Sequence, residues 1–260
     1  MDIEKSKQNS AGNEMIEDAY QKYKKLRQIV KEWQQEKGGY CLENLELANK
    51  PPYLSVQDIP LTAFIELWQQ LNNFSEIAIG DSELRQLWDQ VKMNENTSTD
   101  EINQKILLHL QMAVSGVAQL VTQKIKEENL KTTSTNDNEL DNYKDVSCPI
   151  CAEIPTLTVL EPPNGNRVIH CNMCNYEWQT KRIGCIYCGN TEAKKQMYLN
   201  NEDFPGVEVV VCKVCGKSFK EIDARQLLVE DFMWEDLRTI ELNFATELWL
   251  ENNMPDNKIH

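Results

Sequence analysis

Four copies of the pattern Cys-x-x-Cys within residues 148–215 constrain this chain more than any other feature of its sequence. We call the copies knuckles 1 to 4: Cys148–Cys151, Cys171–Cys174, Cys185–Cys188 and Cys212–Cys215. A knuckle directs two sulfurs at one point, and two knuckles together supply four tetrahedral thiolates, which suit zinc or iron. Eight of the nine cysteines lie in this stretch. The knuckles therefore predict two metal ions, iron or zinc, bound by these eight cysteines.

The spacing of the knuckles predicts which of them share an ion. Nineteen residues separate knuckles 1 and 2, and 23 separate knuckles 3 and 4, whereas only ten separate knuckles 2 and 3. The two longer gaps each fit a hairpin that folds one knuckle over the other, as in a zinc ribbon. We therefore predict one site from knuckles 1 and 2 and a second from knuckles 3 and 4, with an interleaved pairing as the alternative. Gly189 and Gly216 follow knuckles 3 and 4 directly, and glycine accepts the left-handed turn that points backbone N–H groups at the sulfurs.

Two roles for the metals remain open from the residues alone. A purely structural metal would supply on the order of 10–16 kcal/mol per site to a module that has almost no core of its own. The other possible role is that of redox-active iron. A disulfide oxidoreductase needs only one reactive Cys-x-x-Cys at a helix start, and iron–sulfur ferredoxins crowd three cysteines into one short run, so both fit the spacing less well.

Apolar residues before the knuckles recur at helical spacing and predict an all-helical domain over residues 1–145. We expect a disordered start and a linker at about 131–145. The predicted helices cover residues 14–37, ended by Gly38-Gly39, then 61–72, then 82–93 capped by Asp81 or Ser82, and a long helix behind the capping box Ser98-Thr99-Asp100-Glu101. Helices with apolar stripes of this kind pack as a bundle.

The metal module is expected over residues 146–221 and a C-terminal part over 222–260. Short β-type runs lie between the knuckles at Leu157–Leu160, Arg167–Ile169 and Val207–Val211. Residues 224–251 predict one helix, followed by a frayed tail; its stripe is Val229, Met233, Leu237, Ile240, Phe244 and Leu248. The predicted fold class is α+β: an N-terminal all-helical bundle, a double zinc-ribbon or rubredoxin-like module and a C-terminal helix.

The charge balance is acidic, with a formal net charge of −14 at pH 7, which disfavours a nucleic-acid partner. The N-terminus is polar and lacks the apolar core of a secretory signal. The most apolar stretch, Ile106–Val121, is too short and too polar to span a bilayer, so we expect no membrane insertion. Cys-x-x-Cys pairs without a signal favour a reducing compartment, and we expect a cytoplasmic protein.

No motif for an enzyme is found. A nucleophile elbow, a phosphate loop, a zinc-protease helix and a dinucleotide fingerprint are all missing from the sequence. His170 adjoins a knuckle whose site already has four thiolates, so we expect a strand residue there. His109 is predicted to be buried or to face a partner, and Cys41 to be a free thiol. Trp68 and Trp88 are expected in the helical core.

The knuckles and their surroundings resemble the formate dehydrogenase accessory proteins of the FdhE type. Residues 148–188 contain, in order, knuckle 1, Arg167, knuckle 2, Tyr176-Glu177-Trp178, Arg182 and knuckle 3. The family places Glu-Trp just after its second knuckle and an Arg shortly before its third. The resemblance reaches the last helix, where Glu235-Asp236-Leu237 and Thr239 match an acidic-acidic-Leu-x-Thr segment. Ala152 follows knuckle 1 where glycine is common, and Asn175 follows knuckle 2.

This resemblance implies a cytoplasmic maturation factor, not an enzyme, that binds the immature catalytic subunit of formate dehydrogenase. It carries the eight thiolates over as metal ligands, and Glu177, Trp178 and Arg182 only as signature positions of unassigned role. The simplest interpretation is that Trp178 packs the module and Arg182 pairs with Glu177, slightly ahead of direct contact with a partner. The alternatives are a rubredoxin-like electron carrier and, less favoured, a nucleic-acid-binding zinc ribbon.

Overall fold

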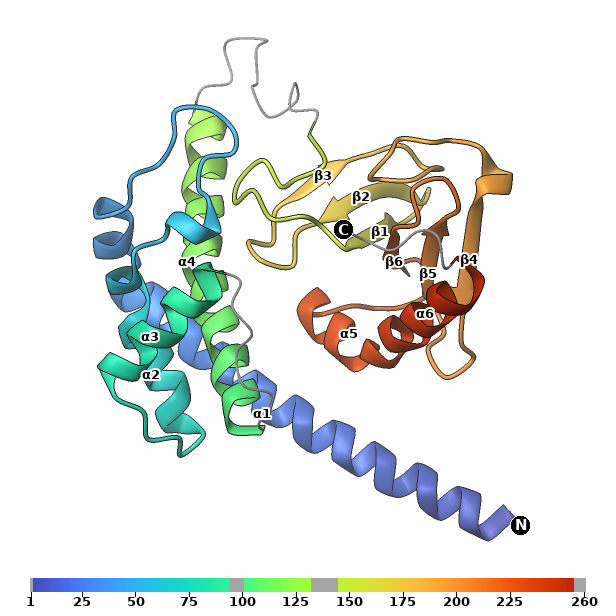
Figure 1. Ribbon diagram of the computed structural model, residues 1–260, viewed down its shortest axis with the longest axis horizontal. Coiled ribbons are helices and arrows are strands. Elements are labelled where there is room, and N and C mark those ends of the chain that lie inside the picture. Colours follow the sequence, from blue (N-terminus) through green and yellow to red (C-terminus); the bar gives the residue numbers. More distant parts are fainter. Residues whose placement is uncertain (1, 94–100, 132–144, 255–260) are drawn as a thin grey trace. The chain divides into compact units, whose positions relative to one another are not determined.

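The computed structural model describes residues 2–93, 101–131 and 145–254 of the chain (Figure 1). It divides into two compact units. Unit 1 comprises residues 1–143 with Pro149–Ala152 and is helical; unit 2 comprises Lys144–Cys148 with Glu153–His260 and contains a six-stranded sheet and two helices. The predicted α+β class, with N-terminal helices followed by a cysteine-bearing sheet and C-terminal helices, is confirmed. Most of the predicted linker lies outside the described residues.

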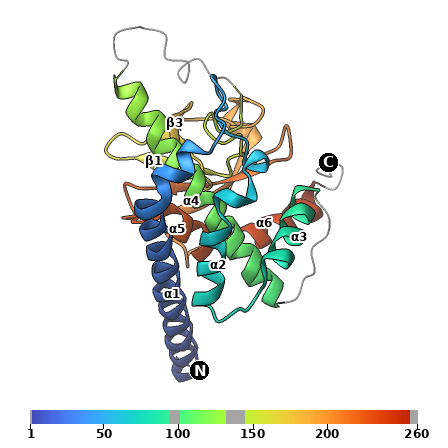
Figure 2. The same cartoon turned by 90° about the vertical axis from the view of Figure 1, so that its left-hand side faces the viewer.

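Unit 1 is built from helices that share one core (Figure 2). In chain order they are α1 (Asp2–Glu43), the 3-10 turns η1 (Val56–Asp58) and η2 (Leu61–Ala63), α2 (Ile65–Phe74), α3 (Asp81–Lys92) and α4 (Glu101–Lys131). Helices α1, α2 and α4 pack on one another. Trp68 is fully buried and its indole N–H donates to the Ile106 carbonyl at 3.0 Å. Phe64 meets Trp88 edge to face, with ring centroids 5.1 Å apart, so both tryptophans belong to the core as predicted.

Helix α1 is longer at both ends than the sequence predicted. It passes through Gly38 and Gly39 and ends at Glu43, because Gly38 packs against α4 instead of ending the helix. A Cβ atom on Gly38 would lie 2.8 Å from a methyl group of Leu120. The helix also begins at Asp2, where we predicted a disordered start; no proline occurs before Pro51 to interrupt it.

Two other helix starts differ from the prediction. Residues 61–72 begin as the 3-10 turn η2, and the α-helix starts only at Ile65. The residue that caps α3 is Gly80, not Asp81 or Ser82: its amide donates to the Glu83 carboxylate at 3.0 Å. That carboxylate satisfies an amide that the helix itself leaves without a partner. The capping box predicted before α4 lies mainly in residues 94–100, outside the described part of the chain.

The sheet of unit 2 consists of two three-stranded ribbons. Ribbon 1 contains β1 (Leu157–Glu161), β2 (Asn166–His170) and β3 (Glu177–Gln179); ribbon 2 contains β4 (Gln196–Asn200), β5 (Val207–Cys212) and β6 (Ser218–Asp223). The strand order is β3-β2-β1-β6-β5-β4, antiparallel within each ribbon and parallel where β1 joins β6. Each ribbon has the order knuckle, hairpin, knuckle, strand. The predicted β-type runs correspond to β1, β2 and β5. The sequence analysis missed β3, β4 and β6, because their sequences are short or mixed in polarity.

The C-terminal residues form two helices where the sequence predicted one. These are α5 (Phe232–Arg238), capped by the Asp231 carboxylate, and α6 (Ile240–Asn253). The break at Thr239 changes the phase of the helix, so Leu242 and Thr246 face inward. Three residues of the predicted stripe are exposed instead: Ile240, Phe244 and Leu248. Leu242 packs with buried residues of β1, β5 and β6 in one core, so these helices cover one face of the sheet.

One described helix segment, Gln104–Glu128 in α4, is long and apolar enough to cross a membrane. It is longer than the stretch that the sequence marked as most apolar. However, 78% of its most apolar window is buried within the structure. The core helix of a water-soluble protein passes the same test, so this segment is weak support for membrane insertion.

Candidate metal centres

All four knuckles adopt the same backbone loop. The residue after the second cysteine has a positive φ in each: +62° at Ala152, +57° at Asn175, +69° at Gly189 and +73° at Gly216. The amide of the first cysteine donates to the carbonyl five residues later in every knuckle, at 2.7, 2.9, 2.9 and 2.9 Å in chain order. Left-handed turns were predicted at the two glycines, and Ala152 and Asn175 adopt them too. The loop is therefore set by the knuckle as a whole, even where the residue is not glycine.

The eight knuckle sulfurs gather into two groups. Site 1 contains Cys148, Cys151, Cys171 and Cys174; site 2 contains Cys185, Cys188, Cys212 and Cys215, and within each site the sulfurs all lie within 4.8 Å of one another. This is the sequential pairing of knuckles, not the interleaved one. The hairpins produce it: Leu157 of β1 pairs with His170, next to knuckle 2, and Gln196 of β4 pairs with Cys212 of knuckle 4.

The distances between sulfurs fit a tetrahedral metal ion. Close pairs are Cys148–Cys174 at 3.5 Å, Cys185–Cys215 at 3.6 Å and Cys188–Cys212 at 3.7 Å. Four sulfurs placed tetrahedrally about 2.3 Å from a zinc ion lie about 3.8 Å apart, whereas a disulfide needs about 2.05 Å. None of the nine cysteines, all of which lie in the described part of the chain, forms a disulfide. The donor sets could therefore hold two metal ions.

Site 1 is enclosed and is braced from α5. All four of its cysteines are buried. The Asn172 amide, inside knuckle 2, donates to one oxygen of Asp236 at 2.9 Å, and the Lys220 ammonium donates to the other at 2.6 Å. Lys220 also donates to the Thr239 hydroxyl at 2.9 Å. The acidic-acidic-Leu-x-Thr segment thus connects knuckle 2, β6 and α5 through one buried ammonium.

Burial of Lys220 carries a cost that these contacts offset. The side chain is 2% exposed. Burial lowers its pKa, and the charge and hydrogen bond of Asp236 act in the opposite direction. A buried ammonium without a partner is strongly unfavourable. Burial of Lys220 therefore depends on its ion pair with Asp236.

His170 is a strand residue, as predicted. It is the last residue of β2, and its Nδ1 atom lies 2.9 Å from the Glu177 carboxylate. Its ring packs on the Phe232 ring, with the ring centroids 4.7 Å apart. The ring therefore contacts Glu177 and Phe232, and His170 is not one of the four residues that form site 1. Trp178 is half-buried and stacks on Tyr176, with ring centroids 6.0 Å apart, so it packs within the module.

Arg182 does not pair with Glu177, and this part of the sequence interpretation is wrong. The β2–β3 register places Glu177 opposite His170, which takes the carboxylate. Arg182 instead lies 3.9 Å from the Glu221 carboxylate of β6. Arg182 therefore contacts a ribbon residue that the sequence analysis did not single out, whereas the partner of Glu177, His170, was named there.

Buried Arg167 was named in the family pattern, but the sequence analysis predicted no role for it. It is 1% exposed, pairs with Glu221 at 2.6 Å and donates to the Gly184 carbonyl at 2.8 Å. Its guanidinium also lies over the Phe219 ring, 5.4 Å from the centroid. An arginine inside the apolar run Arg167–Ile169 was the available signal, because such a side chain is buried only with a partner.

Site 2 is open to solvent where site 1 is not. Cys188 is exposed and Cys215 is half-buried. The Tyr187 amide donates to the Cys185 sulfur at 3.4 Å. Burial raises the pKa of the Cys212 thiol, but hydrogen bonds from the Cys215 and Val214 amides, together with those of the Cys188 and Cys215 side chains, outweigh it and bring the pKa to about 7. Backbone amides directed at sulfur thus favour the thiolate form that a metal requires.

His109 and Cys41 are core residues of unit 1. The His109 ring lies 2.7 Å from the Asn72 side-chain oxygen and 3.2 Å from the Ser75 hydroxyl, and burial lowers its pKa to about 4. Burial raises the pKa of Cys41 to about 11, which leaves it a protonated, unreactive thiol. The buried histidine and the free thiol both agree with the prediction.

Comparison with known proteins gives consistent matches. No family model matches the chain. A "Protein FdhE homolog" of Aquifex aeolicus is 30% identical over 109 residues, which is 40% of this chain and 36% of the relative. A homologue of the same name from Yersinia pestis is 36% identical over 102 residues, 38% of this chain and 33% of the relative. The chain thus spans about a third of the length of the curated relatives that it matches.

A solved structure shows the same fold. It is that of the FdhE protein from Pseudomonas aeruginosa, with a TM-score of 0.53 over 85% of this chain and 81% of that one, at 16% sequence identity. The chain is thus similar to FdhE proteins in sequence over about 40% of its length and in fold over 85% of it. The FdhE likeness includes helices before the knuckles as well as the sheet, since the structural match extends well beyond the residues matched by sequence.

Proposed function

We propose that this chain is a cytoplasmic accessory protein that binds the immature catalytic subunit of formate dehydrogenase during its assembly. In this proposal the chain acts as a chaperone and not as an enzyme. The observation that carries it is the coincidence of two four-cysteine groups with matches to proteins named FdhE. The proposal concerns the whole protein and goes beyond the third of the relatives' length that the sequence matches cover.

The proposal assigns Cys148, Cys151, Cys171 and Cys174 as ligands of one ion and Cys185, Cys188, Cys212 and Cys215 as ligands of another. Bound iron or zinc would hold the knuckles of each ribbon together. The predicted division into residues 1–145, 146–221 and 222–260 is retained in the proposal. Its last two parts share the core that joins α6 to the sheet.

A pull-down tests the proposed function. The full chain is used as bait in extracts of cells that make formate dehydrogenase, beside a Cys171→Ser variant that removes one ligand of site 1. A Cys41→Ser variant is the control because it removes a cysteine outside both sites. We expect the wild-type chain and the control to recover the catalytic subunit and Cys171→Ser to lose it. Recovery of no formate dehydrogenase by the wild type would contradict the proposal.

A second candidate function is electron transfer of the rubredoxin type. The exposed Cys188 favours it, because an iron ion at site 2 would lie close to solvent and to a redox partner. Iron bound by four thiolates absorbs visible light, whereas zinc does not. A colourless, zinc-loaded protein prepared without oxygen would exclude this candidate.

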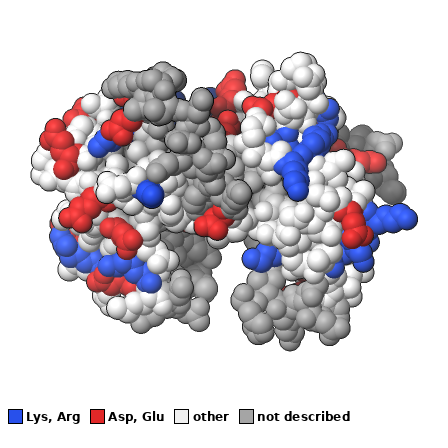
Figure 3. Space-filling view, turned by 90° about the horizontal axis from the view of Figure 1, so that it is seen from above, with Lys and Arg blue, Asp and Glu red and all other residues white. Residues whose placement is uncertain are grey.

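Nucleic-acid binding receives less support from the charges. The chain carries a net charge of −14. On the face shown in Figure 3, Lys and Arg side chains lie among Asp and Glu and uncharged residues. Phosphate binding depends on gathered positive charge, so we expect no binding to DNA or RNA at physiological salt concentration.

A further inference from the structure

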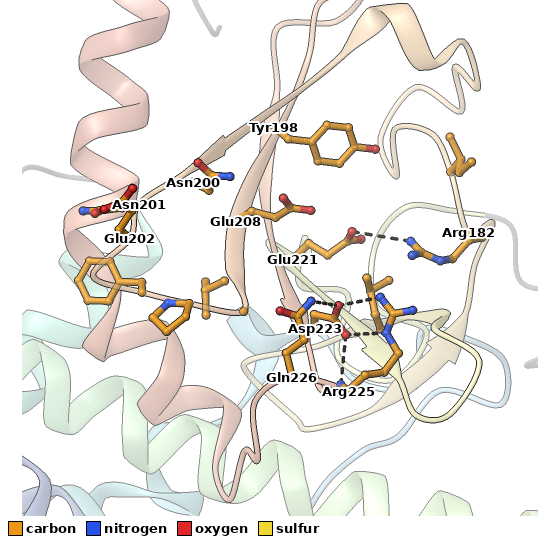
Figure 4. A pocket seen from close by; sticks show the side chains of 16 residues that line it. Arg182, Tyr198, Asn200, Asn201, Glu202, Glu208, Glu221, Asp223, Arg225 and Gln226 are labelled. Carbon is orange, nitrogen blue, oxygen red and sulfur yellow. Dashed lines mark hydrogen bonds and ion pairs between the residues drawn. The ribbon is translucent and has the colours of Figure 1, made fainter.

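One cavity is lined only by residues of unit 2, and none of the knuckle cysteines is among them. It has a volume of about 800 Å³ and opens on the sheet surface formed by β4, β5 and β6 (Figure 4). Its charged and polar lining includes Arg182, Tyr198, Glu208, Glu221, Asp223 and Arg225. Leu160, Ile183 and Phe204 add apolar surface to the same cavity. Helix α6 packs on the opposite face of the sheet, where Leu242 meets Val207, Val209 and Ile222.

Two carboxylates lie directly opposite each other in this cavity. The register of β5 and β6 pairs Glu208 with Glu221. Like charges at directly opposed positions destabilise a sheet. Burial, followed by the negative charges of Glu221 and Asp223, raises the pKa of Glu208. The fold thus retains an arrangement that is unfavourable for its own stability.

Arginines of this chain pair with two of the lining carboxylates, those of Asp223 and Glu221. Arg225 makes a two-pronged contact with Asp223 at 2.7 and 2.6 Å and holds the pKa of that carboxyl at about 2. Arg167 pairs with Oε2 of Glu221. Among the residues that the structure describes, no hydrogen bond or ion pair reaches the half-buried Glu208 side chain.

The two oxygens of Glu221 are held differently. The residue is 2% exposed; its Oε2 atom accepts a hydrogen bond from Thr158 at 3.2 Å and forms an ion pair with Arg167 at 2.6 Å. Its Oε1 atom lies 3.9 Å from Arg182, which is too long for a hydrogen bond. The Arg182 side chain points toward Glu221 (Figure 4) and is 46% exposed. This oxygen therefore has a distant cation beside it and no hydrogen bond from that cation.

We propose that this cavity binds an arginine or lysine side chain of an extended segment of a partner protein, between Glu208 and Glu221. The cation would pair with Glu208 and donate to Oε1 of Glu221, closer than the present contact with Arg182. Tyr198, Phe204 and Ile183 supply surface for the aliphatic part of such a side chain. The cavity is too large for a single bare ion and suits a peptide. The identity of the partner rests on the proposed function, since the segment would belong to the immature catalytic subunit.

Binding of a defined peptide to the full chain tests the chemistry of the cavity. The probe is an acetylated and amidated seven-residue peptide of alanine and glycine with one central arginine, compared by calorimetry with the same peptide carrying citrulline. Citrulline keeps the shape of arginine and lacks its charge. We expect the arginine peptide to bind at least tenfold more tightly, as one partly desolvated charge pair provides. Equal binding of the two peptides would overturn the proposal.

The variant Glu208→Gln separates binding from folding. It should weaken the arginine peptide about tenfold and raise the midpoint of thermal unfolding, because it removes the like-charge pair with Glu221. Glu192→Gln is the matched control: it removes the same charge from an exposed residue that does not line the cavity. Unchanged binding by Glu208→Gln, or an equal loss in Glu192→Gln, would show that the cavity is not the site.

A pull-down with the same variants distinguishes the two proposals. If the wild-type chain recovers the catalytic subunit and Glu208→Gln recovers it equally well, the proposed function stands and the cavity is not its recognition site. If the wild type recovers none while the peptide results are as expected, the cavity binds cationic side chains and the proposed partner is wrong. Recovery by wild type and Glu192→Gln, with loss in Glu208→Gln, supports both.

Discussion

Ribbon 1 buries all four of its knuckle cysteines, whereas ribbon 2 exposes Cys188 and half-exposes Cys215. The two ribbons otherwise repeat the same order of knuckle, hairpin, knuckle and strand, with the same loop hydrogen bonds. The difference comes from what packs on each site. Asn172 of ribbon 1 is bonded to Asp236 of α5, while Cys188 of ribbon 2 is left in solvent. The same knuckle loop therefore occurs in an enclosed site and in a solvent-accessible one.

The accessible site is the better candidate for exchange with solvent or a redox partner. Both sites offer four sulfurs, as structural zinc sites do, but only site 2 has cysteines that are exposed or half-buried. We therefore expect ribbon 1 to depend on its metal for folding and ribbon 2 to lose and regain metal more readily. Four predictions test this comparison.

The largest effect is expected from removing one ligand of site 1. Cys171→Ser should unfold ribbon 1, because its metal contributes on the order of 10 kcal/mol and a whole domain is stable by only about 5–15 kcal/mol. Cys188→Ser should leave the fold largely intact with one metal ion bound. Circular dichroism and elemental analysis of both variants measure this. Equal loss of structure in the two variants would remove the proposed difference between the ribbons.

The next effect concerns the buried ammonium beside site 1. Asp236→Asn should cost about 3–5 kcal/mol of unfolding free energy, because it leaves Lys220 buried without a countercharge. Urea unfolding of the metal-loaded protein gives the value. Glu241→Gln is the control, since that side chain is exposed on α6 and its loss should change stability by less than about 1 kcal/mol. A small cost for Asp236→Asn would mean that α5 does not brace site 1.

Metal release should occur in two phases. A coloured chelator added to the loaded protein should remove the ion of site 2 first, because its sulfurs are exposed to attack, and the ion of site 1 more slowly. We expect the rates to differ by about tenfold or more, and the fast phase to be missing from Cys188→Ser. A single phase for both ions in the wild type would contradict the assignment of site 2 as the accessible one.

The smallest effect distinguishes the knuckle loops. Ribbon 2 has glycine after both knuckles, while ribbon 1 has Ala152 and Asn175 in the same left-handed conformation. Ala152→Gly should therefore raise the stability by about 1 kcal/mol, and Gly189→Ala should lower it by about 1–2 kcal/mol. A Cβ atom on Gly189 meets nothing within 4 Å, so only the backbone conformation is tested. Thermal unfolding of the loaded protein resolves both changes.

Much of the site could be predicted because its signal is local. Two cysteines separated by two residues meet at one point in any such loop, so the four knuckles followed from spacing alone. Spacing favoured their sequential pairing over the interleaved alternative, and the structure shows the sequential one. The partner of Arg182 could not be predicted in this way. It depends on the β2–β3 register, which gives Glu177 to His170, and on β6, a strand that the sequence analysis missed. The exposure of Cys188 likewise depends on packing between distant elements.

By itself, the sequence determined the chemistry of this protein: eight thiolates in four short loops, helices before them and a family resemblance that the matches support. Tertiary structure alone decided which site is enclosed, how α5 reaches knuckle 2 through Lys220 and Asp236, and that Glu208 and Glu221 meet across two strands. The physical reason is distance along the chain. Contacts within a loop follow from a few dihedral angles, whereas contacts between strands and helices depend on the register and packing of the whole unit.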